Sequence, residues 1–151
     1  WTVGEAGFTA RWDGATWTQV SGGKARDLWG MGGVGSTGFA VGDQGFAATI
    51  AKGGFKVGSV GLPKTLKAVG VVGDGQGGVS GALAVGSQGA VAVYKGGVWA
   101  PETPPELGFG ELTGAAGFSD GTFAVTASSG QVWQRTPEGK WSAVASAGRP
   151  G

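Results

Sequence analysis

Two glycine-rich segments are the first candidates for chemistry, because both have the G-x-G-x-x-G spacing of dinucleotide-binding loops. They are residues 30–35 (Gly-Met-Gly-Gly-Val-Gly) and residues 73–78 (Gly-Asp-Gly-Gln-Gly-Gly). Such a loop binds a pyrophosphate where it joins a strand to the N-terminus of a helix. Here each segment leads instead into another β-type run, at 38–41 and at 82–85. We therefore interpret both as loops between strands and expect no cofactor.

Acidic residues could instead ligate a metal ion. Glu5 and Asp43 occupy matching positions in two similar segments, but Ser87 takes that position in a third. A calcium loop needs several carboxylates at alternating positions, whereas Asp74 stands alone among glycines. We expect no metal site, and we interpret Glu5, Asp43 and Ser87 as turn residues whose side chains hydrogen-bond their own backbone.

Acid–base and nucleophilic catalysis have few candidates. The chain has no histidine and no cysteine, which removes the commonest general base, the commonest zinc ligand and any thiolate. The chain has ten acidic residues, so a pair of carboxylates of the kind that glycosidases use remains possible. A sialidase would also need clustered arginines, and the chain has only four, at unlike positions of its repeat, with Tyr94 as its single tyrosine. We expect a protein that is not an enzyme.

Ligand binding without catalysis has better candidates, because the chain has seven tryptophans. An indole stacks on a sugar ring while a nearby polar group takes its hydroxyls. The expected ligand-binding residues are Arg11, Trp12, Trp17, Trp99 and Trp141. The first three form the nearest local set, but the arginine is not repeated in the other units. Carbohydrate binding is therefore an alternative to protein binding.

Charge and hydropathy exclude two other classes of partner. Eleven basic and ten acidic residues give a net charge of +1 and are spread along the chain, so we expect no nucleic-acid binding. No apolar run approaches the ~20 residues of a membrane helix, so we expect no membrane insertion. The sequence begins with Trp1 and its only methionine is Met31, which we interpret as a mature product or a part of a longer protein.

These candidates lie in a sequence that repeats about every 40 residues, and its 35 glycines recur with the repeat. The first landmark is a β-rich run before a glycine turn, with valines 38, 44 and 40 residues apart: Val3, Val41, Val85 and Val125. The second is a turn followed by an aromatic residue: Trp17, Phe55, Trp99 and Trp141. The third is a leucine with a small residue two positions later: Leu28 and Gly30, Leu66 and Ala68, Leu112 and Gly114.

Each period contains four short strand candidates separated by tight turns such as Asp13-Gly14 and Gly53-Gly54. No window has the periodicity of an amphipathic helix. Four strands in each ~40-residue unit predict an all-β protein, a β-propeller built from four-stranded blades. The small residues of the third landmark fit innermost strands, which converge on the axis, and the aromatic residues of the second fit the contacts between neighbouring blades.

The repeat divides the chain into about four blades within one domain, 1–151. The predicted units are a partial blade at 1–23 and blades at about 24–61, 62–103 and 104–147. The first unit begins at the second strand of a blade, so the ring is predicted to be incomplete, or completed by another chain or segment. An open ring exposes strand edges and apolar blade faces. We therefore expect a protein partner, or a second copy, across these open faces.

The order of these motifs resembles a known class of repeat. Leu-Trp-Gly at 28–30, Phe-Ala-Val-Gly-Asp-Gln-Gly at 39–45 and Asp-Gly-Ala-Thr-Trp at 13–17 are similar to bacterial β-propeller repeats of the photosystem II assembly-factor-like and Asp-box (sialidase-like) type. The resemblance covers nearly the whole chain and implies a propeller. It also implies a secreted, periplasmic or cell-surface location.

Together these observations predict a non-catalytic binding or scaffold module. Its expected role is protein–protein interaction, or that of a structural subunit, in a secreted or surface assembly. The first alternative is a carbohydrate-binding lectin propeller. The second is a fragment of a larger sialidase-like hydrolase, whose catalytic residues would lie partly outside these residues.

Overall fold

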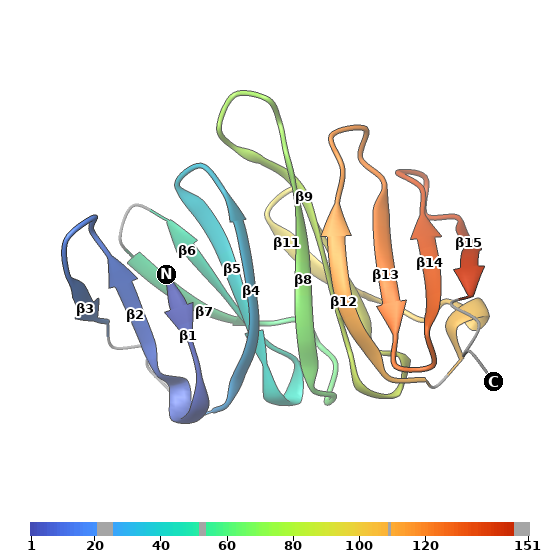
Figure 1. Ribbon diagram of the computed structural model, residues 1–151, viewed down its shortest axis with the longest axis horizontal. Coiled ribbons are helices and arrows are strands. Elements are labelled where there is room, and N and C mark those ends of the chain that lie inside the picture. Colours follow the sequence, from blue (N-terminus) through green and yellow to red (C-terminus); the bar gives the residue numbers. More distant parts are fainter. Residues whose placement is uncertain (21–25, 52–53, 109, 147–151) are drawn as a thin grey trace.

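The computed structural model describes residues 1–20, 26–51, 54–108 and 110–146, and there it has fifteen strands in four antiparallel sheets (Figure 1). The first sheet, or first blade, has three strands: β1 (Thr2–Val3), β2 (Thr9–Trp12) and β3 (Trp17–Gln19). The second blade has β4 (Leu28–Val34), β5 (Thr37–Gly42), β6 (Phe46–Ala51) and β7 (Gly54–Ser59). The third has β8 (Leu66–Gly73), β9 (Val79–Gly86), β10 (Val91–Lys95) and β11 (Val98–Glu102). The fourth has β12 (Leu112–Gly117), β13 (Phe123–Ala127), β14 (Gln131–Arg135) and β15 (Trp141–Ser146).

The four blades stand side by side in an open row, with the first blade at one end and the fourth blade at the other (Figure 1). The innermost strands are neighbours: β4 contacts β8, and β8 contacts β12. The described helices are short 3-10 turns: η1 (Glu5–Gly7), η2 (Asp43–Gly45), η3 (Ser87–Gly89) and η4 (Pro105–Leu107). None of these is long and apolar enough to cross a bilayer. The prediction of an incomplete all-β propeller with about four blades is confirmed.

Small residues let the innermost strands approach one another closely, as the sequence predicted. A Cβ atom added at Gly30 of β4 would lie 2.5 Å from the carbonyl oxygen of Lys67 in β8. A Cβ atom added at Gly70 of β8 would lie 2.9 Å from the backbone of Ala116 in β12. Because real Cβ atoms do not come that near to backbone atoms, larger residues at these positions would push the blades apart.

Apolar side chains fill the spaces between blades. Between the first and second blades, Trp1 and Val3 pack against a cluster that includes Phe46 and Ile50. Between the second and third, the Phe39 ring lies 4.6 Å from Tyr94 and 5.4 Å from Trp99. Between the third and fourth, the shared core holds these residues: Leu83, Val85, Phe123, Val125, Trp133 and Trp141. The sequence predicted that the aromatic residue after each repeated turn lies between two blades. This prediction is confirmed for Phe55, Trp99 and Trp141.

The fourth blade departs by one residue from the alignment of the sequence repeats. In the third blade, Val85 pairs with Ala68 of the innermost strand. In the fourth, the matching partner, Gly114, pairs with Thr126 and not with Val125. Thr126 is therefore the structural equivalent of the repeated valine, and the expected equivalence of Val125 is wrong.

This shift exchanges the two faces of β13. Successive residues of a strand point to opposite faces, so a slip of one residue moves each side chain to the other side. Phe123 and Val125 pack in the core shared with the third blade. Ala124 and Thr126 consequently take the face that points away from it.

An ion pair accompanies the shift at the outer end of the fourth blade. Arg135 pairs with Phe123 in the sheet and is only 7% exposed. Its Nε and Nη2 atoms donate to the Glu102 carboxylate of the third blade at 3.0 and 2.5 Å. A buried guanidinium needs such a partner, so this contact fixes the outer ends of the two blades together.

The repeated Gly-x-x-Gly turn connects each blade to the next. In η2, the Asp43 amide donates to the carbonyl oxygen of Asp27, just before β4 of the same blade (3.1 Å). The Gly45 amide donates to the carbonyl oxygen of Lys64, just before β8 of the next blade (2.7 Å). The turn reaches both acceptors because Gln44 and Gly45 have φ of 54° and 68°, in the left-handed region that favours glycine.

The turn of the third blade has the same geometry. There the Ser87 amide donates to Thr65 in its own blade (2.9 Å), and the Gly89 amide donates to Gly110 just before the fourth blade (2.7 Å). In the first blade, the Ala6 amide donates to the side chain of Asp27 instead (2.8 Å). The second and third turns thus make the same backbone connection to the next blade, whereas the first turn reaches the next blade through the Asp27 side chain.

Replacing Gly45 by alanine should destabilise the protein strongly. The new Cβ atom would overlap the carbonyl oxygen of Leu62, and the alanine backbone would have to adopt a left-handed φ. The matched control is Gly61→Ala, which has φ of 78° but no atom near its Cβ position. We expect the control to cost about 1–2 kcal/mol and Gly45→Ala about 1–3 kcal/mol more, measured by urea unfolding. Equal losses for both variants would contradict a structural role for this turn.

Candidate functional site

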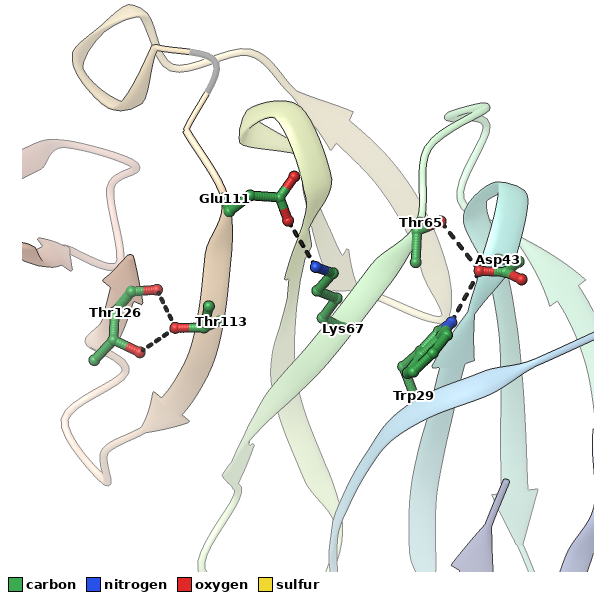
Figure 2. A network of polar contacts seen from close by, with 7 residues as sticks. All are labelled: Trp29, Asp43, Thr65, Lys67, Glu111, Thr113 and Thr126. Atoms are coloured by element: carbon green, nitrogen blue, oxygen red, sulfur yellow. Dashed lines mark hydrogen bonds and ion pairs between the residues drawn. The ribbon is translucent and has the colours of Figure 1, made fainter. Parts of the chain in front are cut away.

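Each innermost strand contains a β-bulge at the same place, next to its first leucine. In β4, Leu28 pairs with Gly42 and Gly30 pairs with Val41, so Trp29 between them has no partner. The pairing of β8 and β12 skips one residue in the same way. A bulge turns the extra side chain out of the regular alternation. The three bulge residues, referred to as the bulge row, are Trp29, Lys67 and Thr113, and they lie side by side on neighbouring strands (Figure 2).

Trp29 is an exposed indole held in a fixed orientation. It is 55% exposed, and its Nε1 atom donates to Oδ1 of Asp43 at 2.9 Å. The same Asp43 oxygen accepts a hydrogen bond from the Thr65 hydroxyl, just before the third blade, at 3.1 Å (Figure 2). The expectation that the Asp43 side chain bonds its own backbone is therefore corrected, because it bridges two blades instead.

Lys67 forms an ion pair with the segment before the fourth blade. Its Nζ atom donates to Oε2 of Glu111 at 2.7 Å, and both side chains are about two-fifths exposed (39% and 41%). The hydrogen bond from Lys67 is the main reason that the pKa of Glu111 lies below its ordinary value. The Glu111 carboxylate is therefore charged at neutral pH.

Thr113 completes the row on β12. Its Oγ1 atom donates to the carbonyl oxygen of Thr126 at 3.3 Å and also lies 3.3 Å from the Thr126 hydroxyl (Figure 2). Thr126 is the residue that the register shift of the fourth blade brings to this position. Each member of the row is thus oriented by a polar group of its own or the following blade.

The row offers one aromatic and two polar groups to a ligand. An oriented indole face, an ammonium group and a hydroxyl cross three blades in sequence. In the described part of the chain, no three His, Cys, Asp or Glu side chains gather as metal ligands would. A rigid aromatic side chain with a polar neighbour is typical of the anchors that dominate protein interfaces.

Of the five ligand-binding residues predicted from the sequence, the structure brings two together. Trp12 and Trp17 pair across β2 and β3 with ring centroids 5.5 Å apart. Arg11, the neighbour of Trp12 in the strand, points to the opposite face. Trp99 and Trp141 pack between other pairs of blades. Ligand binding by these residues remains a prediction.

The two glycine-rich segments have different structures. Residues 74–78 are the connection of β8 to β9, as expected, and residue 73 ends β8. The Asp74 carboxylate accepts the amides of Gln76 and Gly78 (2.7 and 2.9 Å). These backbone hydrogen bonds lower the pKa of Asp74. Residues 30–35 are mostly part of β4 and not a loop, which corrects the expectation for that segment.

Sequence reasoning missed the bulge row. The third landmark identified the leucine and the small residue two positions later, and the bulge residue stands between them. The available signal was the spacing of the leucine and the small residue. In a regular strand, two residues that are two positions apart face the same side of the sheet, so a large and a small residue repeated at this spacing are unexpected. The bulge resolves this by inserting one residue.

Removing the Lys67 ammonium should raise the pKa of Glu111. We expect Lys67→Met to move that pKa upward toward the ordinary glutamate value, because the main hydrogen bond to the carboxylate is lost. In the unsubstituted chain, the contribution of this pair to stability is present above the unfolded-state pKa of Glu111 and is lost as pH falls through its depressed folded-state value. Carbon-13 NMR titration of the Glu111 carboxyl measures the shift. An unchanged pKa in Lys67→Met would contradict this assignment.

No family model matches the chain, and no curated protein sequence does. Among solved structures, YCF48 from Cyanidioschyzon merolae superimposes with a TM-score of 0.63 at 18% identity, over 80% of this chain and 40% of that one. YCF48 bound to D1 peptide superimposes with a TM-score of 0.54 at 16% identity, over 95% of this chain and 64% of that one.

These comparisons concern the fold. The chain spans less than two thirds of the length of either neighbour. They support the propeller fold that the resemblance of the repeats implies. The chain is a β-propeller segment whose blades are arranged like those of YCF48.

Proposed function

We propose that the chain is a non-catalytic protein-interaction module whose bulge row binds an extended segment of a partner protein. The observation that carries the proposal is the exposed Trp29 indole, which Asp43 holds in line with Lys67 and Thr113. One structural neighbour is YCF48 bound to D1 peptide, so a propeller of similar fold accommodates a peptide. That supports this class of ligand here.

The groups of the row suit a polypeptide backbone. The Lys67 ammonium has three N–H donors, and its bond to Glu111 uses one of them. The others can reach backbone carbonyl oxygens of a bound segment, while the Trp29 ring takes an apolar side chain or a proline. Because the row crosses three blades, an extended segment can contact all three residues at once.

Several features support a role in binding over a role in catalysis. Asp43 and Glu111 already accept hydrogen bonds from neighbouring side chains, and the chain has neither histidine nor cysteine. The resemblance of the repeats supports placing this module in a secreted or surface assembly. The location and the identity of the assembly are part of the proposal.

Removing the Trp29 indole should abolish most of the binding. Two probes are used: the D1 peptide, and peptides selected from a random linear phage-display library on the unsubstituted chain. We expect Trp29→Ala to weaken binding of a selected peptide about 30-fold, equivalent to about 2 kcal/mol, measured by isothermal titration. The matched control is Phe118→Ala, because Phe118 is similarly exposed (50%) but lies outside the bulge row. The proposal fails if no peptide binds, or if selected peptides bind Trp29→Ala as well as the unsubstituted chain.

Asp43 should act through the orientation of Trp29. Asp43→Ala removes the acceptor of the indole N–H and should weaken peptide binding severalfold, whereas Asp43→Asn keeps an acceptor oxygen and should retain binding. Thermal unfolding of both variants separates a change of affinity from a loss of fold. Equal affinity of Asp43→Ala and the unsubstituted chain would show that the indole needs no such support.

A further inference from the structure

The first blade exposes large apolar side chains on the face that points away from the second blade. Phe8, Trp12 and Trp17 are 45%, 46% and 56% exposed. Strand pairing identifies the equivalent residues of the second blade. Trp12 pairs with Trp17 in the first blade, and Ile50 pairs with Phe55 in the second, so Ile50 is the equivalent of Trp12 and Phe55 that of Trp17. These residues, together with Ala10, are referred to as the leading face.

Two of the three equivalent residues of the second blade are buried, and the third, Phe55, is partly buried. Phe46, which follows its turn as Phe8 follows η1, is 4% exposed, and Ile50 is 2% exposed. Trp1 and Val3 of the preceding blade cover them. The leading face therefore has the composition of an interblade contact whose other half is absent from the described residues.

The other interfaces show what covers such a face. In the third blade, the equivalent Tyr94 and Trp99 pack against Phe39 of the preceding blade, in a core that also contains Val41. In the fourth blade, Trp133 and Trp141 pack in a core with Leu83 and Val85. The covering pair is the same each time, a large apolar residue followed two positions later by valine: Trp1 and Val3, Phe39 and Val41, Leu83 and Val85.

The fourth blade does not supply this pair to a second copy of the chain. By the register of β12 and β13, its equivalents of Leu83 and Val85 are Ala124 and Thr126. The small side chain of Ala124 and the hydroxyl-bearing side chain of Thr126 cannot cover Trp12 and Trp17 as Phe39 and Val41 cover Tyr94 and Trp99. Head-to-tail stacking of copies would consequently leave a void at the contact.

We propose that the leading face binds one further propeller blade, which presents a large apolar residue and a valine two positions later on its second strand. This inference is independent of the bulge row and of peptide binding. The same partner region also supplies an innermost strand that pairs with β1. Val3 of β1 is the equivalent of Val41 of β5, and in the second blade Val41 pairs with Gly30 of the innermost strand β4. That strand is expected to have the Leu-x-small pattern of β4, β8 and β12.

The chain itself provides the probe. A copy of residues 27–82 placed directly before Trp1 adds one blade, with its Phe39 and Val41, followed by a copy of β8 that can pair with β1. Hydroxyl-radical footprinting with mass spectrometry then reports the reactivity of Trp12 and Trp17 separately. We expect the reactivity of both residues to fall severalfold relative to the unextended chain, and the melting temperature to rise.

The matched control carries Phe39→Ser and Val41→Ser in the added copy only. It keeps the added innermost strand but lacks the covering pair, so Trp12 and Trp17 should stay reactive. Unchanged reactivity with the intact extension would overturn the proposal, as would equal protection by both extensions. Concentration-dependent protection in the unextended chain, with dimers in native mass spectrometry, would identify a second copy as the occupant and also overturn it.

A measurement on the unextended chain decides the matter if the extension does not fold. An uncovered contact face should bind the fluorescent dye anilinonaphthalene sulfonate. We expect the double variant Trp12→Thr and Trp17→Thr to lose most of this dye binding, whereas Phe118→Ser and Val144→Thr, which alter exposed side chains on the fourth blade, should lose little. Dye binding that the Trp12 and Trp17 changes leave intact would overturn the proposal.

Discussion

The arrangement of the second, third and fourth blades depends on two backbone hydrogen bonds from each of the Gly-x-x-Gly turns η2 and η3. One bond reaches the segment before the innermost strand of the same blade, and the other reaches the segment before the innermost strand of the next, as Asp43 and Gly45 show. Both amides point to their acceptors because the turn contains a left-handed residue followed by a left-handed glycine. The turn therefore sets the spacing of neighbouring innermost strands. At that spacing, β4 approaches β8 at Gly30 and β8 approaches β12 at Gly70 so closely that neither position has room for a Cβ atom.

The same turn links the candidate binding surface to the packing of the blades. Asp43 lies in the turn, orients the Trp29 indole and accepts the Thr65 hydroxyl of the next blade. Where the turn has the shorter Ser87, Glu111 from the following segment takes over as the polar partner of the bulge residue, here Lys67. Side chains that are already held in place by such hydrogen bonds would lose less entropy when a ligand binds.

Much of the fold could be predicted from the sequence, because its main constraints repeat. Glycine turns, small residues on innermost strands and interblade aromatics each recur at one period, and each has a packing reason. The register of the fourth blade could not be predicted, since Phe123-Ala-Val resembles Phe39-Ala-Val while the pairing with Gly114 shifts it by one residue. The shifted register is accompanied by the ion pair of Arg135 with Glu102, and a contact between residues so distant in sequence leaves no local pattern. The bulge row was missed for a related reason: its position repeats, but tryptophan, lysine and threonine occupy it, so residue type carries no period.

The shifted register also makes the two ends of the row of blades chemically unlike. If the fourth blade had kept the common register, Phe123 and Val125 would form the covering pair on its free face, and copies of the chain could stack end to end. The shift turns both side chains inward and leaves Ala124 and Thr126 outside. A repeat protein with two complementary ends forms open-ended stacks, whereas one whose two terminal faces do not match does not. The exposed Trp12 and Trp17 at the other end can then be selective for a particular blade, because the chain's own free face does not compete for them.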